Sequence, residues 1–155
     1  MQACPCGRAA AYAACCEPFH RGAEAPDAER LMRSRYAAFA LGEVAYLHRT
    51  LHPDHPEAAT DPRAYAERLR AHLKRARYRG LEVRDARGPD ADGVSWVLFR
   101  VDAMHAGKDA GFAELSCFAV HDGGHRYVGG RTFAANACPA AIDDAVEGAR
   151  ALTPG

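Results

Sequence analysis

Residues 94–105 read VSWVLFRVDAMH, and this stretch indicates the fold class of the chain. In an extended strand, Trp96 and Leu98 fall on one face while Val97 and Phe99 fall on the other. A strand that is apolar on both faces is buried between two layers of structure. The sequence therefore predicts a central strand of a sheet that is covered on both sides.

Turn signals on either side of this strand predict a meander of about four antiparallel strands. Glycine-rich turns at 88–93 and 106–111 bound the strand, and a strand near Leu81 and Val83 precedes it. Two further strands are expected at 112–121 and 125–133, joined by Asp122-Gly123-Gly124. An Asp-Gly pair between apolar runs is a strong hairpin signal.

Three helices are expected before the sheet, at 28–41, 43–51 and 62–77. Asp27 is a suitable N-cap for the first helix, and Asp61-Pro62 begins the third with a capping carboxylate followed by proline. Helices that precede an antiparallel meander give an α+β fold. We expect one domain over 27–134 and a C-terminal tail over 135–155, with a short helix at 140–152.

The N-terminal segment 1–22 carries four of the six cysteines, Cys4, Cys6, Cys15 and Cys16. Zinc is commonly held by four such thiolates, so we predict a small metal-binding knuckle, with iron as an alternative metal. Disulfides and a redox dithiol are competing interpretations. No apolar leader segment precedes the cysteines, and C-x-C differs from the C-x-x-C redox pattern. His20 is an alternative fourth ligand, although we expect it to pack nearby.

The pattern C-P-C-G-x7-C-C, followed by Glu17-Pro18-Phe19-His20, resembles the SEC-C motif of the SecA translocation ATPase. The segments 31–36, 38–39, 46–47 and 50–53 resemble the YchJ family, which joins this motif to a domain like nuclear transport factor 2 (NTF2). The resemblance implies helices under a curved sheet with a cone-shaped cavity. It also implies a knuckle that recognises a protein partner, as in SecA. The basic S-G-K continuation of the motif is replaced by Arg8-Ala9-Ala10. The single Cys138 replaces a second C-terminal motif, so we expect one metal site.

The implied cavity could be a ligand-binding or catalytic site. The candidates for its lining are Arg35, Tyr36, His48, His52, Trp96, Glu114 and Arg131. Glu114 is expected to face inward and to pair with Arg35 or Arg131, whereas His48 is more typical of a core histidine. No Ser/His/Asp set or phosphate-binding loop is present, so no catalytic residue is assigned.

Composition narrows the classes of partner. Twenty basic and twenty acidic residues give no net charge, which argues against nucleic acid and anionic membranes as partners. A basic face on the helix at 62–77 is interpreted as solvated, with an anion- or RNA-contacting patch as the alternative. We expect a cytoplasmic, non-enzymatic metal-binding protein. The open alternatives are a small enzyme or small-molecule binder that uses the cavity, and a metal-trafficking or sensing protein. A homodimer through the open face of the sheet is left undecided by the sequence.

Overall fold

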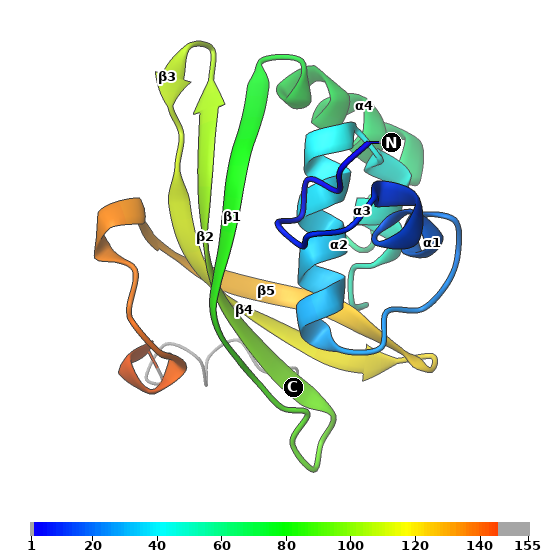
Figure 1. Ribbon diagram of the computed structural model, residues 1–155. Coiled ribbons are helices and arrows are strands. Elements are labelled where there is room, and N and C mark those ends of the chain that lie inside the picture. Colours follow the sequence, from blue (N-terminus) through cyan, green and yellow to red (C-terminus); the bar gives the residue numbers. More distant parts are fainter. Residues whose placement is uncertain (1, 146–155) are drawn as a thin grey trace.

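The computed structural model describes residues 2–145, which form an N-terminal knuckle, three helices and a curved antiparallel sheet (Figure 1). The predicted α+β class is confirmed. Helix α2 lies along the concave side of the sheet, and the knuckle packs across α2, with Gly7 of its loop close to Leu81 of the first strand (Figure 1). The molecule thus consists of a sheet, helices on its concave side, and a knuckle docked on α2 beside the edge of the sheet.

The helices are α2 (Ala28–Leu41), α3 (Val44–Arg49) and α4 (Pro62–Leu73). The carboxylate of Asp27 accepts a hydrogen bond from Arg30 N at 2.8 Å and caps α2. Gly42 ends the same helix with a left-handed φ of 79°, a conformation that glycine adopts without strain. Both ends of α2 therefore agree with the prediction.

Helix α4 is four residues shorter than predicted, and α3 is three residues shorter, one at its start and two at its end. Ala76 and Arg77 were expected at the end of α4 but begin strand β1, where they pair with His105 and Met104 of β2. Past the end of α3, Leu51 forms an isolated parallel bridge with Tyr127. In both places, pairing with a strand replaces the last helical turn.

The sheet has the order β1-β2-β4-β5, and all of these pairings are antiparallel. Its strands are β1 (Ala76–Arg87), β2 (Val94–His105), β4 (Phe112–His121) and β5 (Gly124–Ala134). A two-residue strand, β3 (Lys108–Asp109), pairs with the end of β2 inside the turn expected at 106–111. The predicted strands are thus confirmed, with one short addition.

Register shifts interrupt the ladders at three points, and such bulges bend the strands that carry them. Two lie in the β1–β2 ladder, at Tyr78/Gly80 and Val83/Asp85, and one lies between β4 and β5 at Cys117/Phe118. The curved sheet encloses the space that α2 and α3 partly fill.

The side chains of β2 alternate between the two faces of the sheet, as the sequence predicts. Val97, Phe99 and Val101 pack on the concave side against the helices. Leu98 packs on the convex side with Leu115 and Ile142 of the C-terminal segment. The convex face is therefore partly covered by the chain itself.

The C-terminal segment includes two short 3₁₀ turns, η2 (Ala135–Ala137) and η3 (Ile142–Ala145). Of the helix predicted over 140–152, residues 140–141 are not helical, residues 142–145 form η3, and the rest lies outside the described residues. Within residues 2–145, no helix combines the length and the apolar character that crossing a membrane requires.

Candidate functional site

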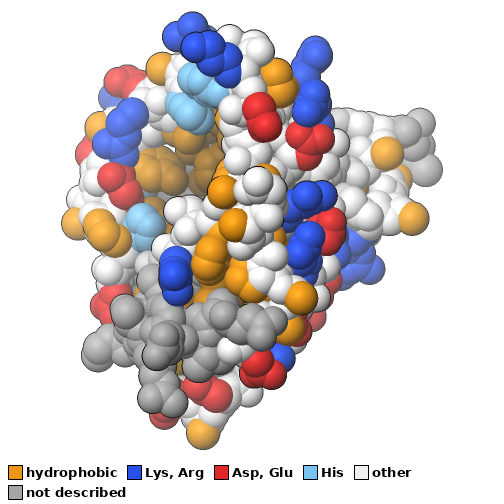
Figure 2. Space-filling model, turned by 90° about the vertical axis from the view of Figure 1, so that its left-hand side faces the viewer, with side chains coloured by type: hydrophobic (Ala, Val, Ile, Leu, Met, Phe, Trp, Pro, Cys, Tyr) orange, Lys and Arg blue, Asp and Glu red, His pale blue; other side chains and the backbone are white. Residues whose placement is uncertain are grey.

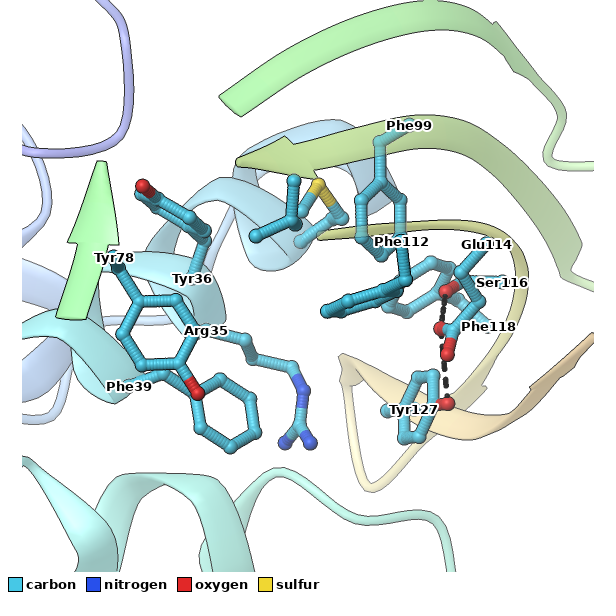
Figure 3. A pocket seen from close by; sticks show the side chains of 12 residues that line it. Arg35, Tyr36, Phe39, Tyr78, Phe99, Phe112, Glu114, Ser116, Phe118 and Tyr127 are labelled. Carbon is cyan, nitrogen blue, oxygen red and sulfur yellow. Dashed lines mark hydrogen bonds between the residues drawn. The ribbon is translucent and has the colours of Figure 1, made fainter. Parts of the chain in front are cut away.

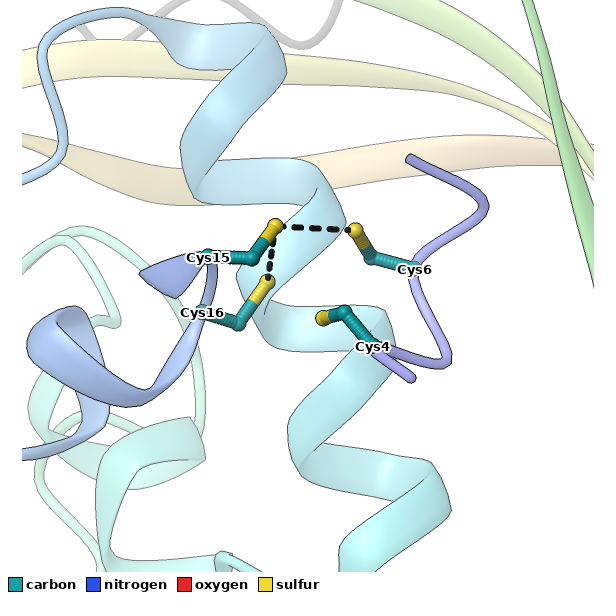
Figure 4. A group of neighbouring side chains, drawn as sticks. All are labelled: Cys4, Cys6, Cys15 and Cys16. Carbon is teal, nitrogen blue, oxygen red and sulfur yellow. Dashed lines mark hydrogen bonds between the residues drawn. The ribbon is translucent and has the colours of Figure 1, made fainter. Parts of the chain in front are cut away.

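The four N-terminal cysteines meet at one point beside α2, and their Sγ atoms all lie within 4.8 Å of one another (Figure 4). Cys4 and Cys6 come from the first loop of the knuckle. Cys15 and Cys16 lie between a 3₁₀ turn, η1 (Tyr12–Ala14), and a one-turn helix, α1 (Glu17–His20). The three-residue η1 is the helical structure of the stretch between the two cysteine pairs.

Backbone hydrogen bonds close the knuckle and bring the two cysteine pairs together. Cys4 N donates to Ala10 O at 2.9 Å, and Tyr12 N donates to Gln2 O at 2.9 Å. Gly7 turns the loop between them with a φ of 88°. The resulting small hairpin faces Cys4 and Cys6 toward the second pair.

The sulfur geometry suits a tetrahedral metal ion. The Sγ atoms of Cys6 and Cys15 are 3.6 Å apart, and those of Cys15 and Cys16 are 4.0 Å apart. Zinc–sulfur bonds of about 2.3 Å place neighbouring sulfurs about 3.8 Å apart in a tetrahedron. A disulfide needs about 2.05 Å, and all four cysteines are free.

Burial and mutual hydrogen bonding give the thiols of the cluster different pKa values. Hydrogen bonding from Cys16 lowers the pKa of Cys6 to about 5, against the opposing effect of burial. Burial raises the pKa of Cys15 to about 11. The side-chain hydrogen bond to Cys6, together with burial, raises the pKa of Cys16 as well. One thiolate is therefore ready to bind a cation, and the other ligands release protons when a metal binds.

His20 lies near the cluster, but both of its ring nitrogens are already used. Nε2 donates to Ser34 O at 2.8 Å, and Nδ1 therefore accepts from Tyr12 OH at 2.7 Å. Burial lowers the pKa of His20, in keeping with a neutral ring. His20 joins the knuckle to α2, and Cys4, Cys6, Cys15 and Cys16 are left as the ligand set.

The knuckle is held on α2 by further contacts. Arg33 donates from Nη1 to Cys6 O at 2.7 Å and from Nε to Glu29 at 3.0 Å. Ala37 of the same helix is fully buried against the cysteines. The cysteines themselves are only 0–6% exposed, so the metal site is closed off between the knuckle and the helix.

A second candidate site is a cavity of about 190 Å³ between α2 and the concave face of the sheet (Figure 3). One wall comes from α2, and the other comes from β1, β2, β4 and β5. The lining is mostly aromatic: Met32, Arg35, Tyr36, Phe39, Tyr78, Phe99, Val101, Phe112, Glu114, Ser116, Phe118 and Tyr127. One face of the molecule shows a hollow with hydrophobic side chains in its depth and charged side chains around its rim (Figure 2).

Arg35, Tyr36 and Glu114 are the predicted cavity residues that the structure places in this lining. The Arg35 guanidinium donates from Nη1 to Leu47 O at 2.8 Å and to Thr50 Oγ1 at 2.5 Å. Its Cζ lies 4.7 Å from the centre of the Tyr127 ring. Burial raises the pKa of Tyr36 to about 12.

Glu114 faces inward as expected, but it pairs with neither arginine. Its Oε2 accepts hydrogen bonds from Ser116 Oγ and, at 3.1 Å, from Tyr127 OH. Burial raises the pKa of Glu114, an effect that these hydrogen bonds and the Arg35 charge oppose. Gly130 makes room for the carboxylate, because a Cβ there would lie 2.3 Å from Glu114 Cδ.

The other four predicted residues lie outside this lining. The ring of His48 packs against Tyr65, with the ring centres 5.0 Å apart. The ring of His52 packs against His121, with the ring centres 5.5 Å apart. Trp96 and Arg131 belong to the convex side of the sheet, where Trp96 packs near Leu98 and Arg131 lies over Phe133. These four positions correct the expected set, because the register of β2 and β5 directs Trp96 and Arg131 away from the helices.

Two polar cavity residues, Ser116 and Tyr127, were absent from the prediction. Ser116 could have been found, since it follows Glu114 by two residues on the same face of β4. Tyr127 depends on the register shift opposite Phe118, for which the sequence carries no separate signal.

Comparison with known proteins agrees with this architecture. Residues 27–130 match the family model described as YchJ, middle NTF2-like domain. The chain is 38% identical over 130 residues to the UPF0225 protein YchJ of Shigella dysenteriae, covering 83% of this chain and 82% of the relative.

Two solved structures of SEC-C motif containing proteins are similar to this chain. The solution structure from Rhodopseudomonas palustris has a TM-score of 0.70 and 28% identity, covering 83% of this chain and 96% of its own. The crystal structure from Psychrobacter arcticus has a TM-score of 0.67 and 26% identity, covering 82% and 80%.

Proposed function

Because the chain belongs to the YchJ family, with its middle NTF2-like domain over residues 27–130, we propose that it is a zinc-binding protein that acts by recognising a partner protein. Cys4, Cys6, Cys15 and Cys16 hold one zinc ion. The ion locks the knuckle onto α2, and the knuckle and the domain present one joint surface to the partner.

The convergence of four sulfur atoms carries the metal part of this proposal. A site with four protein ligands and no open position is typical of structural zinc. The knuckle contributes little hydrophobic burial besides Tyr12 and Phe19, so metal binding supplies much of its folding free energy. Burial of the sulfurs favours a slowly exchanging ion over a trafficking or sensing role.

The outer surface of the knuckle supports the partner-recognition part. Gln2, Arg8, Ala9, Ala13 and Pro18 are exposed there, and most of these side chains are small. Small side chains leave the backbone of a metal-fixed loop accessible to a second protein. The resemblance to the SEC-C motif favours the same role, by analogy with SecA.

Binding is favoured over catalysis by the composition of the cavity. Its lining residues include no histidine and no cysteine. Ser116 donates to Glu114, but no positioned imidazole is within the lining to activate it as a nucleophile. The aromatic and polar side chains that line the cavity are suited to binding a small molecule.

The test is the metal content of the protein purified without added metal, compared with two matched cysteine variants. We expect one zinc per chain in the wild type and in Cys138→Ser, because Cys138 lies outside the cluster. Cys15→Ser should lose the zinc. Iron in the wild type, a metal lost to mild chelators within minutes, or loss of zinc from Cys138→Ser would contradict the proposal.

A further inference from the structure

The cavity contains a buried positive charge that the described residues do not neutralise. Arg35 is 7% exposed, and its Nη1 donates hydrogen bonds to Leu47 O and Thr50 Oγ1. Its guanidinium also lies within hydrogen-bonding reach of the Tyr65 side chain, but within residues 2–145 it forms no ion pair. A buried charge without a counter-charge is costly, and an anion bound beside it would offset that cost.

Glu114, the acidic residue of the cavity lining, does not act as the counter-charge of Arg35. The Glu114 carboxyl is engaged with Ser116 and Tyr127, which lie on β4 and β5. Burial raises its pKa, which favours the neutral form. Arg35 keeps its proton in proteins, and the hydrogen bonds of Glu114 go to Ser116 and Tyr127, so the guanidinium has no ion-pair partner in the lining.

The walls around Arg35 are aromatic and already arranged in edge-to-face pairs. Tyr36 and Tyr78 have ring centres 5.8 Å apart, and Phe99 and Phe112 have ring centres 6.4 Å apart. Aromatic side chains prefer such offset or edge-to-face contacts. One more aromatic ring placed between these walls would find the same kind of contact.

The size of the cavity limits the ligand. At about 190 Å³, it is somewhat larger than an apolar cavity of about 150 Å³, which accommodates benzene. The additional space suits one short polar substituent on a single ring. The guanidinium of Arg35 is the residue type best matched to a carboxylate, because it donates two parallel hydrogen bonds.

We propose that this cavity binds a small aromatic monocarboxylate. The carboxylate accepts hydrogen bonds from Nε and Nη2 of Arg35, and the ring packs between the aromatic side chains of α2 and the sheet. Binding here does not depend on the role proposed for the knuckle. A cationic ligand, which aromatic walls can also hold, would be repelled by Arg35.

The test uses the full-length, zinc-loaded protein and three probes of one shape: phenylacetate, neutral phenylacetamide and cationic phenethylammonium. Isothermal titration calorimetry should show saturable one-to-one binding of phenylacetate, and binding at least about tenfold weaker for the amide, which lacks the charge-assisted pair. Phenethylammonium should not bind. Equal binding of the amide, tighter binding of the cation, or no binding of phenylacetate up to about 10 mM (a standard free energy near −3 kcal/mol) would overturn the proposal.

Two arginine variants locate the contact. Arg35→Gln should weaken phenylacetate binding at least about tenfold, since it removes the charged donor. Arg131→Gln removes an exposed arginine on the convex side of the same sheet and should leave the affinity unchanged. An equal loss in both variants would contradict the assignment to Arg35.

A third variant keeps the test decisive if Arg35→Gln fails to fold. Phe112→Trp enlarges a half-buried side chain of the lining and should fill the cavity without removing any polar contact. It should abolish phenylacetate binding while the sheet remains folded by circular dichroism. Unchanged binding in this variant would place the ligand elsewhere and refute the cavity site.

Discussion

Ser34 joins three elements through two oxygen atoms. Its hydroxyl donates to Leu31 O at 2.8 Å and accepts from Tyr46 OH at 2.7 Å. Its carbonyl oxygen accepts from His20 of the knuckle. All of these atoms lie in a buried region, where each polar group depends on the others for its hydrogen bonds.

Ser34→Ala should therefore lower the free energy of unfolding by about 1–3 kcal/mol, because the Tyr46 hydroxyl then stays buried without its acceptor. Adding Tyr46→Phe to this variant should restore part of the loss, because both partners are then apolar. Urea unfolding at neutral pH measures both values. A neutral Ser34→Ala, or a double variant as unstable as the sum of the single ones, would argue against the hydrogen bond.

Glu114 predicts a pH dependence of stability. Its pKa in the folded protein is raised by burial, so the folded state binds the proton more tightly than the unfolded state does. Its contribution to stability is then present at low pH and is lost as the pH rises from about 4.3, the unfolded value, through the raised folded value.

Glu114→Gln removes this titration. The stability of the variant relative to the wild type should rise between pH 4 and pH 8, as measured by urea unfolding at each pH. A relative stability that falls over this range would mean that Glu114 is ionised and stabilised in the folded protein, contrary to the effect of burial.

At the scale of single residues, the sequence predicted the candidate site residues better than the groups that contact them. The four cysteines and the inward Glu114 follow from spacing and alternation. The partners of Glu114 do not, because the side of the sheet that Tyr127 and Arg131 face depends on the register shift opposite Phe118. The engagement of His20 by Tyr12 and Ser34 likewise depends on how the knuckle docks.

Among the elements, α2 is the one against which both the knuckle and the cavity are built. Arg33 binds the knuckle from one side of the helix, while Arg35, two residues on, enters the cavity from another. Side chains two residues apart on a helix point to nearly opposite sides. One helix therefore positions both candidate sites.

Removal of the α2 cap tests this central role. Asp27→Ala deletes the acceptor for Arg30 N and should cost about 1 kcal/mol of unfolding free energy. Asp61→Ala deletes the matching cap of α4, where Ala64 N donates at 3.0 Å, and should cost a similar amount. Thiol reactivity toward a small reagent should increase in Asp27→Ala and not in Asp61→Ala, since α2 packs against the cysteines through Ala37. Increased reactivity in Asp61→Ala instead would contradict this.

Helices and strands were predictable where local pattern and tertiary structure agree. The limits of α2, β2 and β4 follow directly from caps, turns and alternation. The end of α4 does not, because Ala76 and Arg77 have helical neighbours in sequence but gain ladder hydrogen bonds with β2. The two-residue β3 is also set by its partner strand and not by its own composition.

At the scale of the whole molecule, the knuckle and the domain have separate buried clusters. The cysteines and Tyr12 form a small buried cluster with Ala37, separate from the main core around Phe118 and Leu47. Under the proposed function, the first cluster depends on its metal to fold because it is small, whereas the sheet and helices have a core of their own.

Zinc removal should therefore unfold the knuckle alone. After a strong chelator is added, hydrogen exchange should lose protection over residues 2–20 and on the first turns of α2. The amides of β2 and β4 should keep theirs. Rebinding of zinc should restore the pattern. Protection lost uniformly across the sheet would show that the domain depends on the metal, and an unchanged knuckle would show that it needs none.

The central claim is that four sulfur atoms of this chain hold one zinc ion. X-ray absorption at the zinc edge of the purified protein measures the ligand type and distance directly. The account predicts four sulfur ligands at about 2.3 Å and no nitrogen ligand. A shell with nitrogen at about 2.0 Å would bring His20 into the site and break its observed hydrogen bonds, and a protein without zinc would contradict the account outright.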